Sequence, residues 1–210
     1  MSCAHSERRS CADETDGVTA SPEALTIRYL YAATALGWVA AELRQSRRRR
    51  SNATTSDAGS IRFLRTFAVL GAVAASIVTS AVPGADLHPR LTAAWIGLAV
   101  LWCGVGLRLW CFRTLGQYFT FTVQTSGDQQ VISAGPYRLV RHPSYLAILI
   151  ALVGIGLSIG NWAALLALEF FTLIGLVRRI RVEERALLAE LGERYASYAR
   201  GRKRLVPYVW

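Results

Sequence analysis

Apolar residues are grouped along this chain into long runs, and charged residues stand almost entirely between those runs. The first three runs cover residues 24–43, 61–82 and 92–112. A helix of such a length measures about 30 Å, which matches the thickness of the hydrocarbon core of a bilayer. The pattern therefore predicts three membrane-spanning helices in the N-terminal half of the chain.

A fourth apolar run, at residues 146–177, is too long for one crossing, because as a single helix it would measure about 48 Å. Gly160-Asn161 interrupts the run, so we expect a hairpin of two shorter helices. Residues 178–199 are charged and carry apolar residues at helical spacing, which predicts an amphipathic C-terminal helix. The predicted fold class is an all-α integral membrane protein with about five transmembrane helices.

The net charge of +10 raises the question of a nucleic-acid partner. The arginines, however, cluster at the ends of the apolar runs, where positive charge sets the orientation of membrane proteins. With the N-terminus outside, only Arg8, Arg9, Arg28 and Arg90 of the 24 lysines and arginines lie on the outer side. We therefore expect a multi-pass protein with residues 113–145 and the C-terminal helix on one cytoplasmic face, and no nucleic acid bound.

The N-terminal residues and the cysteines add little chemistry. Residues 1–22 lack the apolar core of a signal peptide and are predicted to be a disordered tail. Cys3 and Cys11 lie in that tail, whereas Cys103 and Cys111 lie in one predicted helix, about 12 Å apart in rise and too far to bridge. We expect neither a structural disulfide nor a bound metal.

Polar and aromatic side chains are densest at residues 135–145, with the sequence Gly-Pro-Tyr-Arg-Leu-Val-Arg-His-Pro-Ser-Tyr. Pro143 suits the first turn of a helix and places His142 at its mouth, where free N–H groups attract electron-rich ligand groups. The alternative is that His142 only caps the helix and that Tyr145 is an aromatic residue of the membrane interface. The neighbouring tyrosine and arginine favour a ligand site.

The C-terminal helix carries a second candidate group. Arg179 and Glu183 are one turn apart and share a face with Leu187. Charged residues of this kind, here Arg179, Glu183 and the adjacent Glu184, usually form a run exposed to solvent. These three residues fall where a predicted span leaves the membrane, and this position makes a binding site the alternative interpretation. In that site a carboxylate holds an amine or ribose, and an arginine grips a carboxylate through two hydrogen bonds.

Two further polar residues are less clear. Gln124 ends the aromatic segment 115–124, whose pattern is typical of the membrane interface, and its amide is a candidate ligand contact. Glu169 lies in the middle of the predicted fifth span, where an acidic side chain is costly. A functional role and a helix-packing role for Glu169 both remain open.

Together these motifs closely resemble the isoprenylcysteine carboxyl methyltransferase family and its relatives among the phospholipid methyltransferases. The resemblance covers residues 115–207, and the first three predicted spans share only the family's general character. The motifs that carry it are Gly135-x-Tyr137-x-x-x-Arg141-His142-Pro143-x-Tyr145, Arg179-x-x-x-Glu183-Glu184-x-x-Leu187, Leu191-Gly192-x-x-Tyr195-x-x-Tyr198 and Arg204-Leu205-Val206-Pro207.

The resemblance implies a methyltransferase that uses S-adenosylmethionine without a Rossmann domain. Transmembrane helices 1–3 would lie in residues 23–113, and residues 114–210 would form the catalytic region, with a cytoplasmic catalytic loop and transmembrane helices 4–5. By matching, Arg179 is the catalytic residue and binds the substrate carboxylate. The implied cofactor contacts are Gln124, the strand-like Gln130, Val131 and Ile132, then Tyr137, His142, Pro143, Ser144, Tyr145 and Glu183.

The implied activity is carboxyl O-methylation of an isoprenylcysteine-like or other lipophilic acceptor that enters from the lipid bilayer. Methylation of a phospholipid amine or a small thiol is the first alternative. A membrane sterol-type reductase and a non-enzymatic scaffold are the others. A bacterial source would place the protein in the plasma membrane, and the identity of the acceptor stays open.

Overall fold

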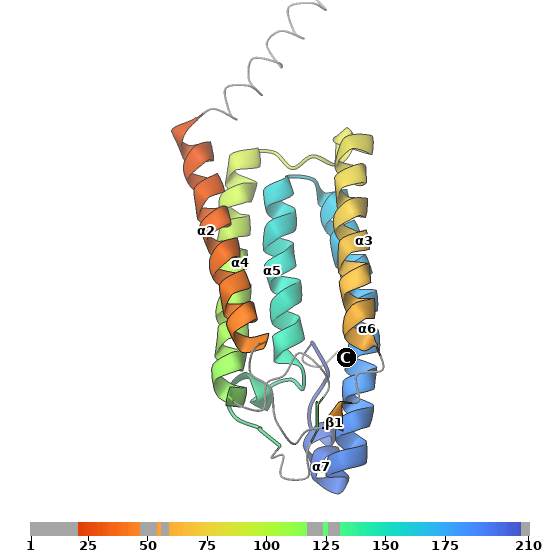
Figure 1. The fold of residues 1–210 in the computed structure, drawn as a ribbon. Helices are drawn as coiled ribbons and strands as arrows, with labels where there is room; N and C mark the ends of the chain where they lie inside the picture. The colour runs from red at the N-terminus through yellow and green to blue at the C-terminus, as the bar shows by residue number, and fades with distance from the viewer. Residues whose placement is uncertain (1–20, 47–53, 56–58, 117–123, 126–130, 207–210) are drawn as a thin grey trace, which may run out of the picture.

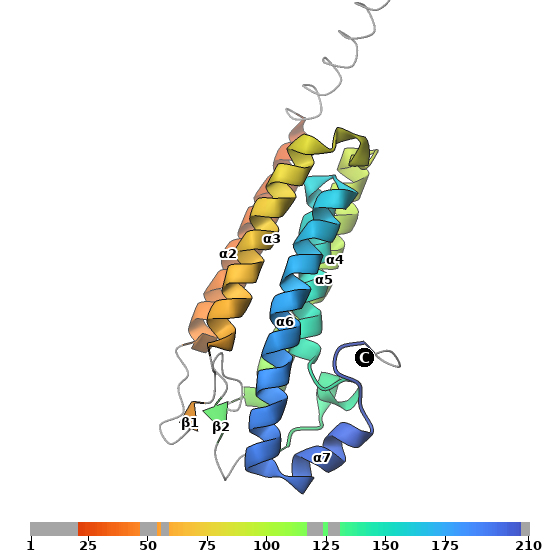
Figure 2. The same cartoon turned by 90° about the vertical axis from the view of Figure 1, so that its right-hand side faces the viewer.

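The computed structural model describes residues 21–46, 54–55, 59–116, 124–125 and 131–206. Its long helices lie side by side, as Figures 1 and 2 show. Shorter elements gather at one end of this bundle. The long helices are α2 (Pro22–Ser46), α3 (Ser60–Ala81), α4 (Arg90–Leu115), α5 (Pro143–Ile159) and α6 (Trp162–Leu191). The shorter elements at that end are α7 (Glu193–Arg200), the 3-10 turn η3 (Gly135–Arg138) and the strands β1 (Thr54–Thr55) and β2 (Gln124–Thr125). At the opposite end, the 3-10 turn η1 (Pro83–Ala85) joins α3 to α4.

The predicted helical fold is confirmed for the bundle, with one small exception. Strands β1 and β2 pair antiparallel, with Thr54 opposite Thr125 and Thr55 opposite Gln124. This pairing joins the α2–α3 and α4–α5 connections. Of the predicted N-terminal tail, residues 1–20 lie outside the described residues, and α2 begins at Pro22.

The outer faces of the bundle carry large apolar side chains. Helices α3 and α4 are long and apolar enough to cross a membrane, and α5 is an apolar helix of 17 residues. Val69, Ile77, Trp102 and Phe170 are at least half exposed on these and neighbouring helices. A protein surrounded by water rarely exposes so much apolar surface. The bundle therefore suits a lipid environment.

Glycines set the distance between α4 and α5. A Cβ atom on Gly104 would lie 2.5 Å from the backbone nitrogen of Ala151, and a Cβ atom on Gly154 would lie 2.5 Å from the carbonyl oxygen of Gly97. No real side chain fits at these distances, so the two helices pack backbone against backbone. On the other side of the bundle, the buried Gly71 and Ala75 of α3 face α6, as their spacing in the sequence predicts.

The predicted hairpin break is confirmed at its expected position. Gly160 has a φ of 74° and ends α5, and the side chain of Asn161 accepts a hydrogen bond from the backbone N–H of Ala164 at the start of α6. The prediction of a separate charged helix is wrong in one respect. Helix α6 continues without a break to Leu191, and the chain turns only at Gly192, whose φ is 53°.

The close α4–α5 contact yields a stability prediction. We expect Gly104→Ala to lower the free energy of unfolding by about 1–3 kcal/mol, because its methyl group would collide with the backbone of α5. Gly106 lies on the same helix, and a Cβ atom there meets nothing within 4 Å. Gly106→Ala is therefore the matched control, with an expected change within about 0.5 kcal/mol. Equal unfolding of both variants in detergent, followed by circular dichroism, would contradict this packing.

Candidate active site

The C-terminal segment lies against the His-Pro segment at the start of α5. The backbone N–H of Arg141 donates to the carbonyl of Lys203 at 2.8 Å, and that of His142 donates to the carbonyl of Arg204 at 2.9 Å. Val140 and Lys203 form a parallel bridge beside them. Residues 203–204 therefore belong to the same site as the motif that precedes α5.

The carboxylate of Glu184 joins these segments to α6. Its Oε1 atom lies 2.8 Å from Nη1 of Arg141 and 3.3 Å from Nε2 of His142. Its Oε2 atom accepts a hydrogen bond from Nε of Arg204 at 2.8 Å. Only 6% of the residue is exposed. A buried carboxylate is stable only when paired, and here its partners come from two segments, the one before α5 and the C-terminal one.

The surroundings of Glu184 act on its pKa in opposite directions. Burial, the largest single effect, raises the pKa of the carboxyl group. Hydrogen bonds with His142 and Arg204, together with the charges of His142 and Arg141, outweigh burial and hold the pKa below its usual value. Glu184 is thus a charged member of a buried ion-pair network near neutral pH.

The neighbouring Glu183 takes part in a second network. Tyr145 donates a hydrogen bond from its hydroxyl to Oε2 of Glu183 at 2.6 Å, and it accepts one from Nε of Arg179 at 3.1 Å. Nη1 of Arg179 donates to the hydroxyl of Ser60 on α3 at 2.7 Å. Arg179 is only 2% exposed. The Tyr145 hydroxyl therefore stands between a carboxylate and a buried guanidinium.

A cavity opens next to Glu183, between the end of α4, the η3 turn, α6 and α7. One part of its wall is apolar and the other is polar and aromatic. The apolar residues are Leu115, Val131, Ile132, Leu187 and Leu191, and the others are Tyr137, Arg141, His142, Glu183, Tyr195 and Tyr198. The hydroxyl of Tyr198 donates to the carbonyl of Tyr137 at 2.9 Å and ties α7 to η3.

Three buried polar atoms of residues that line this cavity lack a hydrogen-bond partner among the described residues. They are Nε of Arg141 and the hydroxyls of Tyr137 and Tyr195. The Tyr137 hydroxyl also lies near the thiol of Cys111, which is a weak partner. Burial and then the charges of Glu184 and Glu183 raise the pKa of Tyr195, so its hydroxyl keeps its proton. Unpaired buried donors are costly, so this wall suits a ligand with several acceptor atoms.

The structure brings half of the expected cofactor contacts to this cavity. Val131, Ile132, Tyr137, His142 and Glu183 line it. Val131 and Ile132, however, form no strand, contrary to the expectation from the sequence. Gln130 and the side chain of Gln124 lie outside the described residues.

The other three expected contacts are not among the residues that line the cavity. Pro143 begins α5, and the hydroxyl of Ser144 accepts a hydrogen bond from Arg108 of α4. Tyr145 stacks on His142, with ring centroids 5.7 Å apart, and reaches Glu183 and Arg179 with its hydroxyl. These three residues belong to the helix turn that presents His142 to the cavity, so they support the position of His142.

Several residues of the site were not assigned a role from the sequence. Tyr195 and Tyr198 follow Leu187 and Leu191 at helical spacing, and this spacing is the signal in the sequence that places all four on one face; all four line the cavity. Interpreting Arg179 and Glu184 as a solvated charge run is wrong, because both are buried. Glu169 does not line this cavity, and its buried Oε1 atom has no hydrogen-bond partner among the described residues.

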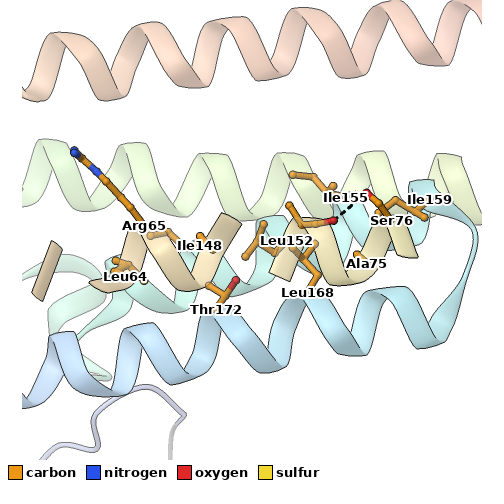
Figure 3. A pocket seen from close by; sticks show the side chains of 12 residues that line it. Leu64, Arg65, Ala75, Ser76, Ile148, Leu152, Ile155, Ile159, Leu168 and Thr172 are labelled. Atoms are coloured by element: carbon orange, nitrogen blue, oxygen red, sulfur yellow. Dashed lines mark hydrogen bonds between the residues drawn. The ribbon is translucent and has the colours of Figure 1, made fainter. Parts of the chain in front are cut away.

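A second, larger cavity is a groove between α3, α5 and α6, shown in Figure 3. It has a volume of about 500 Å³, and most of its lining is aliphatic. Thr172 on its α6 wall and Arg179 are seven residues apart, which places them on one helix face about 10 Å apart. The lining residues are Leu64, Arg65, Ala68, Ala72, Ala75 and Ser76 of α3, Ile148, Leu152, Ile155 and Ile159 of α5, and Leu168 and Thr172 of α6.

The groove and the Arg179 network share α3 as well as α6. Leu64 lines the groove, and Ser60, one turn before it, accepts a hydrogen bond from Arg179. Among the described residues, no group of three or more His, Cys, Asp or Glu side chains is arranged to hold a metal ion. The polar cavity thus adjoins the Tyr145–Arg179 contact through Glu183, and the apolar groove lies one to two helix turns from it along α3 and α6.

Comparison with known proteins agrees with the resemblance seen in the motifs. Residues 95–189 match the family model described as the isoprenylcysteine carboxyl methyltransferase (ICMT) family. The chain is 30% identical over 129 residues to a probable protein-S-isoprenylcysteine O-methyltransferase of Oryza sativa subsp. indica, covering 59% of this chain and 68% of that protein. It is 27% identical over 102 residues to the protein YpbQ of Bacillus subtilis (strain 168), covering 48% of this chain and 61% of that protein.

The fold also has a solved counterpart. The structure of the eukaryotic intramembrane Ras methyltransferase ICMT is similar with a TM-score of 0.56 and 27% sequence identity, over 69% of this chain and 52% of that one. The chain therefore spans between about half and about two thirds of the length of these proteins.

The Glu184 network predicts a pH-dependent stability. Glu184→Gln leaves Arg141 and Arg204 without their carboxylate, so we expect the free energy of unfolding at neutral pH to fall by about 3 kcal/mol. Because the folded-state pKa is below the ordinary value of 4.5, the carboxylate stabilises the protein above that value. This contribution is lost as the pH falls through the folded-state pKa.

The measurement is the pH dependence of thermal unfolding in detergent. The difference between wild type and Glu184→Gln should be largest above the ordinary pKa of 4.5 and should shrink as the pH falls below the lowered folded-state pKa. Glu190→Gln, at an exposed position of the same helix, is the control and should follow wild type throughout. A wild-type advantage that stays constant down to the lowest pH would argue against the ion-pair network.

Proposed function

Because the chain belongs to the isoprenylcysteine carboxyl methyltransferase (ICMT) family, we propose that it is a membrane methyltransferase that uses S-adenosylmethionine. Its substrate in this proposal is the carboxylate of an isoprenylcysteine-like or other lipophilic acceptor. The observation that carries the proposal is the Tyr145 hydroxyl, which joins Glu183 at the polar cavity to Arg179, two helix turns along α6 from Thr172 of the groove. A donor and an acceptor bound on its two sides would meet there.

The proposed topology has five spans, formed by α2, α3, α4, α5 and the apolar part of α6 up to residue 177, with the N-terminus outside. The distribution of arginines in the sequence supports this orientation. In the structure, the start of α5, the end of α6 and α7 lie at the end of the bundle opposite the start of α2 (Figure 1). The site would then face the cytoplasm, and a bacterial protein of this kind would lie in the plasma membrane.

The polar cavity suits S-adenosylmethionine in its chemistry. The unpaired donors of Arg141, Tyr137 and Tyr195 fit a ligand rich in oxygen and nitrogen acceptors. Glu183 would accept hydrogen bonds from a ribose or an ammonium group, and Leu187 offers an apolar surface for a base. When bound, S-adenosylmethionine supplies a methyl group that its sulfonium already activates.

Arg179 would hold the acceptor. Its guanidinium is fixed by Tyr145 and Ser60 and can align a carboxylate through paired hydrogen bonds. A carboxylate is already ionised at neutral pH, so its oxygen can form the new C–O bond while the sulfur keeps the electron pair of the broken S–C bond. The reaction needs alignment and a dry site rather than a general base. His142 accordingly serves as a cofactor contact and not as a base.

The apolar groove would receive the lipid tail of the acceptor. It follows α3 and α6 away from Arg179, and most of its lining is aliphatic. A tail placed there leaves the carboxylate at the polar end of the groove. Among the alternatives, a phospholipid amine fits less well, because the positive charge that its nitrogen gains on methylation would develop beside the like charge of the buried Arg179.

The proposal predicts a specific loss of acceptor binding in Arg179→Lys. Lysine keeps the charge but loses the two-pronged geometry, so we expect kcat/KM for a prenylcysteine carboxylate to fall by about 100-fold, or about 2.7 kcal/mol. The affinity for S-adenosylmethionine, measured by calorimetry, should change by less than about twofold, because lysine keeps a charged donor for the Tyr145 hydroxyl, which holds Glu183 at the cavity.

The matched control for this test is Arg181→Lys, since Arg181 is exposed two residues further along the same helix. It should keep wild-type turnover. Full activity of Arg179→Lys with a carboxylate acceptor would overturn the assignment of Arg179, and equal methylation of an aminolipid by wild type would favour the first alternative.

The groove predicts a second effect. Ala72 lines it and is exposed, so Ala72→Phe should fill the groove without disturbing the core. We expect KM for a long-tailed acceptor to rise by about tenfold, because a lost apolar contact of about 1.4 kcal/mol has this effect. A short-tailed acceptor should be unaffected. Val73→Phe, at an exposed position outside the groove, is the control, and equal effects of the two variants would exclude the groove as the tail site.

A further inference from the structure

Arg108 is a buried arginine of α4 that contacts the first turn of α5. It is 4% exposed. Its Nη1 atom donates to the carbonyl oxygen of Ser144 at 3.0 Å and also to the Ser144 hydroxyl. The guanidinium lies over the ring of Phe112, 4.9 Å from its centroid. Arg108 therefore binds the helix turn that carries the His-Pro motif.

The charge of Arg108 is balanced by Glu42 of α2. Nε of Arg108 donates to Oε1 of Glu42 at 2.9 Å, and Nη2 donates to Oε2 at 3.3 Å. The indole N–H of Trp38, one turn earlier on α2, donates to the same Oε1 atom at 2.8 Å. This two-pronged pair fixes the plane of the guanidinium, so the direction of its contact with Ser144 depends on Glu42.

The turn held by Arg108 is held on its other side by the candidate active site. His142 contacts Glu184, and Tyr145 contacts Glu183 and Arg179 of α6. Ser144 lies between these two residues in the sequence, and its contacts are with α4 instead. The same turn is thus clamped between α6 and the Arg108–Glu42 pair.

We propose that Glu42 and Arg108 are positioning residues for the proposed methyl transfer. Glu42 orients Arg108, Arg108 holds Ser144, and the turn around Ser144 keeps His142 at the cofactor cavity and Tyr145 at Arg179. The inference rests on the proposed function. Glu42 lies outside residues 95–189, which match the family model, so the inference also gives α2 a part in the site.

The physical reason is the cost of an unpaired buried charge. Without the carboxylate of Glu42, the guanidinium must turn towards other acceptors or towards water. Its hydrogen bonds to Ser144 then change direction, and the turn loses one side of its clamp. If Glu42 only attached α2 to the bundle, removal of its carboxylate would instead loosen α2 and leave this turn unchanged.

The first test is hydrogen–deuterium exchange of Glu42→Gln, which keeps the size of the side chain and removes its charge. We expect exchange in peptides that cover residues 140–147 to become about tenfold faster. The control is Glu23→Gln, which removes the same charge at an exposed position near the other end of α2. This readout requires no ligand, so it decides the inference even if the protein does not bind S-adenosylmethionine.

The second test is calorimetric titration of S-adenosylmethionine. Glu42→Gln should weaken binding by about tenfold, whereas Glu23→Gln should match wild type. In an Arg108→Met background, the Glu42→Gln change should weaken binding no further, because Glu42 acts through Arg108. Glu42→Asp keeps the charge at a shorter reach and should recover part of the affinity; it also serves if Glu42→Gln fails to fold.

Each outcome has a distinct meaning. Faster exchange confined to α2, with residues 140–147 unchanged, would overturn the inference and leave Glu42 as an anchor of the helix. Additive losses of affinity in the double variant would overturn the route through Arg108. Absence of binding in wild type would overturn the proposed function, while the exchange at residues 140–147 would still support or refute the positioning role.

Discussion

The buried carboxylate of Glu184 is the constraint on which the site depends. A charge removed from water must be paired, and its partners Arg141, His142 and Arg204 come from the segment before α5 and from the C-terminal segment. Meeting this requirement fixes α6, the start of α5 and the C-terminal segment as one unit. Glu183 is rotated by about 100° on the same helix. It therefore faces the cavity, so that of two consecutive acids one stabilises the site and the other is available to a ligand.

The start of α5 is the structural element on which all the parts of the site converge. Two buried arginines reach it from different helices, Arg179 through Tyr145 and Arg108 through Ser144. On one side of the turn lies the polar cavity, and the apolar groove begins beyond Arg179. This division matches the two partners of the proposed reaction, a polar methyl donor and a lipophilic acceptor.

The sequence was sufficient to predict the long helices, because the apolar runs and the Gly160-Asn161 break are local features. The motifs also identified the elements that meet at the site. A motif does not distinguish a residue that lines a cavity from one that supports it, and Pro143, Ser144 and Tyr145 are not among the residues that line the cavity. The Glu42–Arg108 pair was not recognised, because its partners are far apart in the sequence and meet only through helix packing. All the cofactor contacts, including Gln124 and Gln130, remain predictions.

The central claim is that the cavity beside Glu183 binds S-adenosylmethionine. Calorimetric titration of S-adenosylmethionine into wild type and Tyr195→Phe tests it most directly, because the Tyr195 hydroxyl is buried and lacks a hydrogen-bond partner among the described residues. The account predicts binding to wild type and about tenfold weaker binding to Tyr195→Phe, with no loss of thermal stability. Absence of binding to wild type, or equal affinity of the two proteins, would contradict it.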